Sequence, residues 1–545
     1  MNNCPAHSLP SAVSPRSQMW LGASLLLVLL RAFPSIYYPL GRDQATFCYI
    51  GQRLWEGKQL YLNLWDTKPP GIFYLYALIV KVFGTAMWSA GVVDLLWLLV
   101  ISCFIFKFAE RFLGTAPAVI AVVLHATWRA WSGYWDAAQP ENFLVLFVIA
   151  AYFLSSYSGK RRWLYDFLSG ILFGAAFWLK YNAVAFLPLP LILPYLDFSP
   201  LEAGRRLPRF TLSVGDWMRR VGVWATGFTG SVAGVLGYLR WSGAWPAMKE
   251  IELEVLPRYN AMAIERSVSY WLYVYHQIGR ELGWWSVLVV VTAILVARRT
   301  HDLRSTLPVF LAAAMGAVCT AMQARLQSYA FETCYPFFAM LWGYLGVKVF
   351  QSFRYFARWC WGRNFRLAAV LVWLVFANLL YLPLPGEIVQ LNLYLYDLGA
   401  WWTDRDTFYS NYPWARPISH YDGQMHVIRY LREKSTPQDG VFIWGSEPLI
   451  YFLAQRNPPT RFVTNLGVIS LWTPPAWRLE LMRDLEAAPP KYIVVGREDW
   501  APMLSFNFLD SAAYLQQRFP ALLLFVTSHY QKVDDDRDFV IYRHD

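Results

Sequence analysis

The chain has 545 residues, of which 56% are hydrophobic and only 16% are charged. Soluble domains carry about 25% charged residues, so this composition excludes an ordinary soluble protein and indicates an integral membrane protein with a polar portion attached. The net charge of +11 comes from basic residues in short loops between apolar segments, where they set membrane orientation and give little support to nucleic-acid binding.

Cysteine and histidine give no sign of a metal centre. The six cysteines are scattered, and the eight histidines form no H-E-x-x-H pattern or similar cluster. We therefore expect neither a disulfide framework nor a metal site built from His and Cys.

The chain begins with a Ser/Pro-containing stretch, residues 1–18, which we expect to be a disordered cytoplasmic N-terminus. The apolar run at 19–40 is too long for the core of a signal peptide and lacks an A-x-A end. It is therefore interpreted as a retained signal anchor.

Apolar runs that approach about 20 residues predict about 11 transmembrane helices. The expected spans are 19–40, 88–106, 115–132, 142–158, 165–181, 183–197, 221–240, 282–297, 305–322, 333–350 and 366–384.

The distribution of basic residues supports this topology. Clusters of lysine and arginine occur at 107–111, 160–162, 205–220, 298–304 and 354–366. With the N-terminus in the cytoplasm, all of these clusters fall in cytoplasmic loops, provided that residues 71–84 do not span. That segment is short for a span and suits an interfacial helix on the outer face.

The outer face then gathers the loop 41–87 and the chain after about 385. Shorter outer loops are expected at 133–141, 180–182, 241–281 and 323–332. We assign 19–384 to a transmembrane domain and 385–545 to a soluble extracytoplasmic domain.

In residues 385–545, apolar strand candidates alternate with amphipathic helices, which predicts a small α/β domain with a largely parallel sheet. The strand candidates are 441–445, 461–464, 491–496, 521–527 and 538–543, and the helix candidates are 424–434, 447–456 and 476–488. No G-x-G-x-x-G or P-loop occurs there, so nucleotide binding has no support, and we interpret the domain as a lid or an acceptor-docking domain.

The most informative polar stretch is 41–71, which lies between hydrophobic segments. Asp43 follows the first span, and Lys68 precedes a Pro-Pro pair where hydrophobicity resumes. Ionisable groups at a membrane boundary are costly to desolvate, so these two favour a membrane enzyme in which Asp43 takes a proton and Lys68 pairs with a lipid phosphate. The structural alternatives are a helix N-cap for Asp43 and a snorkelling side chain for Lys68.

Further candidates lie at other positions of the outer face. Glu141 opens a span directly after a proline, where it also complements the helix dipole. Lys180 and Arg325 are cations near span ends, which either anchor helices or bind a phosphate. Asp136 and Asp66 are secondary candidates.

Together these features resemble the family 39 glycosyltransferases of the GT-C fold, a group that includes the protein O-mannosyltransferases and the bacterial aminoarabinose transferases that modify lipid A. The resemblance covers most of the chain. Its elements are the acid after the first span, the aromatic-rich loop that ends in K-P-P at 68–70, the proline and acid at 140–141, the segment S-Y-A-F-E-T-C-Y-P-F-F-A at 328–339, and the C-terminal α/β domain.

The resemblance implies a cell-envelope glycosyltransferase of the plasma (inner) membrane. Such an enzyme transfers a sugar, with inversion, from a polyprenyl-phosphate donor to a lipid, glycan or protein acceptor on the outer face. The resemblance also implies Asp43 as the catalytic acid, Lys68 as the lysine at the lipid phosphate, and Glu141 as the acid of the second outer loop. The transfer requires no cofactor, and a divalent metal remains compatible with it.

The chain departs from the family pattern after Asp43. Many relatives carry an acidic pair or an arginine there, whereas Gln44, Ala45 and Thr46 follow here. No inserted domain of the mannosyltransferase type is present in the loops, which disfavours protein mannosylation. The alternatives are a transporter or flippase of a lipid-linked sugar, for which no internal repeat is found, and a non-catalytic receptor or scaffold.

Overall fold

The computed structural model describes residues 15–157, 161–193, 213–263, 268–269, 272, 276–277, 280–281, 284–300, 302–323, 327–362, 370, 384–412, 420–499 and 502–544. The chain divides into two compact units. The helical unit comprises Met1–Ser35, Asp94–Val232 and Arg266–Gly399, and the mixed unit comprises Ile36–Val93, Ala233–Glu265 and Ala400–Asp545. The expected division at residue 385 into a membrane domain and an extracytoplasmic domain stays a prediction.

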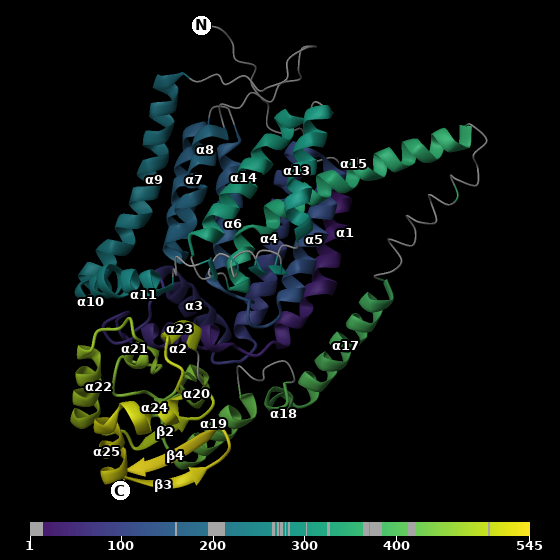
Figure 1. The fold of residues 1–545 in the computed structure, drawn as a ribbon. Helices are drawn as coiled ribbons and strands as arrows, with labels where there is room; N and C mark the ends of the chain where they lie inside the picture. Colours follow the sequence, from purple (N-terminus) through teal and green to yellow (C-terminus); the bar gives the residue numbers. More distant parts are fainter. Residues whose placement is uncertain are drawn as a thin grey trace. The chain divides into compact units, whose positions relative to one another are not determined.

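The helical unit is built from apolar helices (Figure 1). They are α1 (Pro15–Ala32), α4 (Ser89–Leu113), α5 (Thr115–Ser132), α6 (Pro140–Ser155), α7 (Arg162–Leu179), η2 (Tyr181–Phe186), α8 (Pro188–Ile192), α9 (Val214–Trp241), α13 (Trp284–Arg299), α14 (Leu303–Ala321), η5 (Ser328–Thr333), α15 (Tyr335–Gly362) and α17 (Leu384–Thr403). Helix α4 begins in the mixed unit, and α9 and α17 end in it.

Two helical stretches among the described residues are long and apolar enough to cross a membrane, Pro15–Tyr37 and Ser89–Leu113. Their mean hydropathies are 1.7 and 2.2. Shorter apolar helices include Pro140–Ser155 and Ser305–Ala321. The count of about 11 spans therefore stays a prediction.

Three expectations for this part of the chain need comment. Helix α1 begins at Pro15, inside the stretch 1–18 that we expected to be disordered, because proline suits the first turn of a helix; residues 1–14 lie outside the described residues. The described part of the expected span 183–197 is divided into η2 and α8, which meet at Leu187 before a proline, and residues 194–197 lie outside the described residues. Most of the span expected at 366–384 also lies outside the described residues.

The mixed unit combines loop helices with the C-terminal part of the chain. Its helices are α2 (Arg42–Trp55), α3 (Pro70–Phe83), α10 (Trp245–Lys249), the π-helical η4 (Glu250–Val255), α11 (Leu256–Ala263), α18 (Arg405–Ser410), α19 (Tyr421–Lys434), α20 (Pro448–Ala454), α21 (Leu466–Ile469), α22 (Ala476–Ala487), α23 (Pro502–Ser505), α24 (Ser511–Arg518) and α25 (Pro520–His529). The short 3-10 turn η1 (Phe33–Tyr37) lies where the chain passes from one unit to the other.

Helices α2 and α3 pack closely through a glycine and an aromatic cluster. A Cβ at Gly51 would lie 2.7 Å from the backbone nitrogen of Ala77, so only glycine lets the two backbones approach this far. The ring of Phe47 contacts Phe73 and Tyr76 at centroid distances of 5.7 and 5.2 Å. Segment 71–84 thus corresponds to helix α3 and its C-cap Gly84, and its interfacial position stays a prediction.

One four-stranded sheet lies in the mixed unit, with strand order β1-β2-β4-β3. The strands are β1 (Val441–Trp444), β2 (Tyr492–Gly496), β3 (Tyr530–Asp535) and β4 (Phe539–His544). Strand β1 pairs with β2 in parallel, while β2 with β4 and β4 with β3 are antiparallel. Both β1 and β2 are buried throughout, which explains why their sequences are unbroken apolar runs.

Three parts of the sheet prediction were wrong. Residues 521–527 lie in helix α25, where Leu522, Phe525 and Val526 are buried at helical spacing. Residues 461–464 form no strand. The sheet is mainly antiparallel because the polar strand β3, which the sequence did not reveal, forms a hairpin with β4.

We predict that Gly343→Ala destabilises the helical unit, because a Cβ there would lie 2.4 Å from the carbonyl oxygen of Pro117 in α5. Overpacking of this kind costs about 1–3 kcal/mol. The midpoint of thermal unfolding of the purified variant, compared with that of the wild type, measures this loss of stability. Gly346→Ala in the same helix is the matched control, since its nearest neighbour, Ile120 Cδ1, is 3.9 Å away. Equal midpoints for the two variants would contradict this packing.

Candidate active site

Asp43 and Lys68 form an ion pair in the mixed unit. Asp43 lies in the first turn of α2, and Lys68 lies shortly before α3. The distance from Lys68 Nζ to Asp43 Oδ2 is 3.1 Å. The side chain of Lys68 is 19% exposed and that of Asp43 is 32% exposed. A carboxylate and an ammonium therefore meet at an accessible point. The sequence predicted that these residues act together; their contact is observed, and their roles stay a prediction.

The structure does not use Asp43 as a helix cap. The N-cap residue of α2 is Gly41, and no side chain caps this helix end. Asp43 lies inside the first turn, where its charge complements the helix dipole. Its carboxylate thus remains available to Lys68.

Lys68 is held in place by neighbours on its own loop. Its backbone N–H donates to Asp66 Oδ1 at 2.9 Å, and the Tyr61 hydroxyl donates to its carbonyl oxygen at 2.8 Å. Its Nζ lies 5.0 Å from the centroid of the Phe47 ring, a cation–π contact. Burial lowers the pKa of Lys68, but Asp43 and Asp66 outweigh this and raise it, so the ammonium stays protonated.

Arg42, the residue before Asp43, forms a second ion pair. Arg42 donates from Nη2 and Nε to Glu447 Oε1, at 2.6 and 3.2 Å. Burial raises the pKa of Glu447 to about 7, although the guanidinium of Arg42 opposes this shift. The pair joins α2 to α20, so the start of the helix that carries Asp43 is fixed by a side chain far along the chain.

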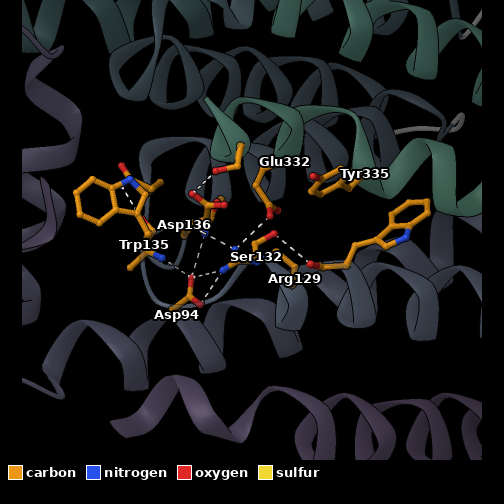
Figure 2. Close-up of polar contacts among 12 residues, drawn as sticks. Asp94, Arg129, Ser132, Trp135, Asp136, Glu332 and Tyr335 are labelled. Atoms are coloured by element: carbon orange, nitrogen blue, oxygen red, sulfur yellow. Dashed lines mark hydrogen bonds and ion pairs between the residues drawn. The ribbon is translucent and has the colours of Figure 1, made fainter. Parts of the chain in front are cut away.

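The helical unit contains a buried charge network centred on Arg129 (Figure 2). Its Nη2 donates to both carboxylate oxygens of Asp94, at 2.9 and 2.7 Å, and its Nη1 donates to Glu332 Oε1 at 3.2 Å. All three side chains are at most 6% exposed. Ionised groups at this depth require pairing, which Arg129 provides for two carboxylates from different helices.

The same network fixes the loop between α5 and α6, which is predicted from the sequence to lie on the outer face. Asp94 Oδ1 accepts the backbone N–H of Ala138 at 2.8 Å, and the Asn142 amide donates to the carbonyl oxygen of Asp136 at 2.9 Å. The Ser328 hydroxyl donates to Asp136 Oδ1 at 2.7 Å. Burial raises the pKa of Asp136 to about 7, and this hydrogen bond opposes the shift only in part.

Glu141 and Lys180 also pair within the helical unit. Lys180 Nζ lies 2.6 Å from Glu141 Oε1 and donates to Gln323 Oε1 at 3.0 Å. The Glu141 side chain is fully buried in the first turn of α6, while Lys180 caps the C-terminus of α7. Two predicted candidates are thus brought together, in a different unit from Asp43 and Lys68. Arg325 lies outside the described residues.

Sequence reasoning missed Arg42, Asp94, Arg129, Glu332 and Glu447. Asp94 and Arg129 each lie inside an expected span, so charged residues in apolar helices were a signal that could have found them. No local pattern marks the partnership of Arg42 with Glu447, because 405 positions separate them. Among the described residues, no three His, Cys, Asp or Glu side chains form a group suited to a metal ion.

Comparison with known proteins supports the sequence interpretation. Residues 67–213 match the family model of dolichyl-phosphate-mannose-protein mannosyltransferases. The crystal structure of ArnT from Cupriavidus metallidurans bound to undecaprenyl phosphate is similar over 97% of this chain and 98% of that one, with a TM-score of 0.56 and 13% identity. The chain has the GT-C fold. The resemblance to family 39 glycosyltransferases is thereby confirmed, and the fold is that of a polytopic helical membrane protein.

Other comparisons add little to the GT-C assignment. The oligosaccharyltransferase of Archaeoglobus fulgidus, tethered with an acceptor peptide, has a TM-score of 0.46 at 12% identity, over 89% of this chain and 69% of that one. A comparison with curated protein sequences finds no match.

We predict that Arg129→Met lowers the stability of the helical unit by about 3–5 kcal/mol, because it leaves Asp94 and Glu332 buried without a counter-charge. Thermal unfolding of the purified protein measures the change. Arg219→Met is the matched control: Arg219 pairs with Asp216 but is 77% exposed, so its loss costs less than about 1 kcal/mol. Similar effects of both variants would contradict the network.

We predict that Asp136 makes stability depend on pH. Its pKa is about 7 in the folded state, against an ordinary value of 3.8. Between these values the unfolded chain releases the proton while the folded protein keeps it, so this group lowers stability as pH rises from about 4 to 7. Asp136→Asn should therefore lose less stability than the wild type between pH 5 and pH 8, by ~2–3 kcal/mol. Parallel curves of unfolding midpoint against pH would rule out this assignment.

Proposed function

We propose that this protein is a membrane glycosyltransferase that moves a sugar, with inversion, from a polyprenyl-phosphate donor to an acceptor on the outer face of the membrane. The family match over 67–213 and the GT-C fold support this, and ArnT, which has a similar fold, was crystallised with undecaprenyl phosphate. The observation that carries the proposal is the accessible ion pair of Asp43 and Lys68, 3.1 Å apart.

Lys68 is suited to bind the donor phosphate. Its ammonium is protonated and oriented by the loop around Asp66, and it is exposed enough to exchange its partner. A phosphate oxygen that replaces Asp43 at Lys68 gains a charge-assisted hydrogen bond. The same exchange releases the carboxylate of Asp43 to act as a base, so donor binding and base activation are coupled.

The transfer then needs only one proton movement. The acceptor hydroxyl attacks the anomeric carbon of the donor sugar, and Asp43 takes the hydroxyl proton. The bond between that carbon and the phosphate oxygen breaks, and the electron pair leaves with the polyprenyl phosphate, whose charge Lys68 stabilises. Attack opposite the leaving group inverts the anomeric centre. No cofactor enters this step.

We assign the base to Asp43 rather than to Glu141. Glu141 is fully buried and already neutralised by Lys180 at 2.6 Å, which favours a role in joining α6 to the end of α7. Asp66 Oδ1 accepts the backbone N–H of Lys68, so we assign it a role in positioning the lysine. Lys180 and Arg325 remain proposed additional phosphate ligands, and Asp136 remains a secondary acid.

The membrane orientation is part of the proposal. The family resemblance favours a plasma (inner) membrane. The basic clusters favour a cytoplasmic N-terminus and an extracytoplasmic position for the residues after 385. This puts Asp43 and Lys68 on the outer face, where a lipid-linked donor presents its sugar.

We predict that Asp43→Asn lowers sugar transfer by about 10²–10⁴-fold, because the amide cannot take the acceptor's proton. The assay uses purified protein, a panel of radiolabelled polyprenyl-phosphate sugars, and native membrane extract as the source of acceptors. Labelled product made by the wild type names the sugar.

Glu433→Gln is the matched control, since it makes the same carboxylate-to-amide change at an exposed position of α19. It should transfer as well as the wild type. Full activity of Asp43→Asn would remove Asp43 from the mechanism. Movement of the labelled donor across vesicles without any product would instead favour transport of a lipid-linked sugar.

A further inference from the structure

The loops that follow the two parallel strands of the mixed unit carry a buried polar cluster. Strand β1 ends at Trp444 and β2 at Gly496, and an acid follows each at the third position, Glu447 and Asp499. Because β1 and β2 are parallel, both loops lie at the same edge of the sheet. In open α/β sheets, the carboxyl ends of the strands are where a charged or polar group is received.

Asp499 is the centre of this cluster and is buried. Its Oδ1 accepts the backbone N–H of Ser511 at 3.0 Å, and its Oδ2 accepts the Ser511 hydroxyl at 2.7 Å and the backbone N–H of Ser446 at 3.3 Å. A Cβ at Gly496 would lie 2.7 Å from the same Oδ2, so glycine at the end of β2 makes room for the carboxylate. Asp499 therefore fixes Ser446, the residue directly before Glu447.

Glu447 connects this cluster to the start of α2. Its buried carboxylate accepts from Nη2 of Arg42 at 2.6 Å. Burial lowers the pKa of Arg42, but Glu447 and Asp499 outweigh this and raise it, so the guanidinium remains charged. The edge of the sheet that receives a ligand in other α/β folds thus receives the side chain of Arg42.

The first turn of α2 is held by contacts with the C-terminal part of the chain. Its N-cap is Gly41, and no side chain caps this helix end. The residues on either side of Gly41 are both held. The carbonyl oxygen of Leu40 accepts the hydroxyl of Tyr421 at 2.7 Å, and Arg42 has its ion pair. Asp43 is the next residue, so these contacts fix the backbone from which its carboxylate extends.

We propose that Glu447 and Asp499 are positioning residues of the transferase, which act through Arg42 to hold the carboxylate of Asp43 toward the acceptor hydroxyl. This inference rests on the proposed function. A general base must lie within hydrogen-bonding reach of the proton that it takes, and a displacement of about 1 Å can lower a rate by about 10²-fold. Lys68 is held by its own loop, so loss of the positioning residues slows the chemical step and spares donor binding.

Steady-state kinetics of the full-length protein, with the radiolabelled polyprenyl-phosphate sugar that the wild type uses, test the proposal. We expect Glu447→Gln to lower kcat by about 10- to 100-fold and to change the KM for the donor by less than about twofold. Asp499→Asn should lower kcat by about 3- to 10-fold, because it places an amide nitrogen or a neutral oxygen where Ser446 donates. The matched control is Glu498→Gln, beside Asp499 but 59% exposed, which should leave both constants unchanged.

A double-mutant cycle separates positioning from a general loss of stability. If Glu447 acts through Arg42, the double variant Arg42→Gln/Glu447→Gln loses about as much kcat as either single variant, and the two losses do not multiply. Glu447→Asp, which keeps the charge on a shorter side chain, should recover part of the rate. If Glu447→Gln fails to fold, Arg42→Gln carries the test with the same expected loss of kcat, because Arg42 lies at a partly exposed position.

The outcomes distinguish this inference from the proposed function. The positioning role is overturned if Glu447→Gln keeps the wild-type kcat, if it raises only the KM for the donor, or if the losses in the double variant multiply. Transfer that is lost in Asp43→Asn but kept in Glu447→Gln overturns the positioning role alone. A wild type that transfers no sugar from any donor overturns the proposed function and the positioning role with it.

Discussion

Pairing of buried charge is the constraint on which the helical unit depends most. Arg129 carries a full positive charge among apolar helices, and Asp94 and Glu332 reach it from different parts of the chain. Because neither carboxylate could remain ionised there alone, the three positions fix α4, α5 and η5 together. Asp94 also accepts the backbone N–H of Ala138, so the same pairing shapes the loop before α6.

Charge pairing also positions elements of the mixed unit, where some of the paired side chains are partly exposed to solvent. Arg42 is tied to Glu447, and the adjacent Asp43 is left to Lys68. One residue of α2 thus anchors the helix to the C-terminal part of the chain, and the next carries an accessible carboxylate. Such a division between a buried positioning pair and a half-buried pair suits a site that must exchange an internal partner for a charged ligand.

The sequence reveals what is local and misses what is distant. Asp43 and Lys68 were found because each lies where the sequence predicts a membrane boundary, within one short stretch. Helices α20 and α22 and strands β1 and β2 were found from periodicity and apolar runs. The run at 521–527 was assigned to a strand because a short apolar segment is compatible with both a strand and a helix. It forms helix α25, whose buried residues recur at helical spacing. Arg42 and Glu447 were missed because only folding brings them together across 405 positions.

The central claim is that Lys68 exchanges Asp43 for the phosphate of a polyprenyl donor. Cryo-electron microscopy of the purified protein with undecaprenyl phosphate tests it directly. We predict density for the phosphate within hydrogen-bonding distance of Lys68 Nζ, with the Asp43 carboxylate turned away from the lysine and open to an acceptor. A phosphate bound elsewhere, with the Asp43–Lys68 ion pair intact, would contradict the account.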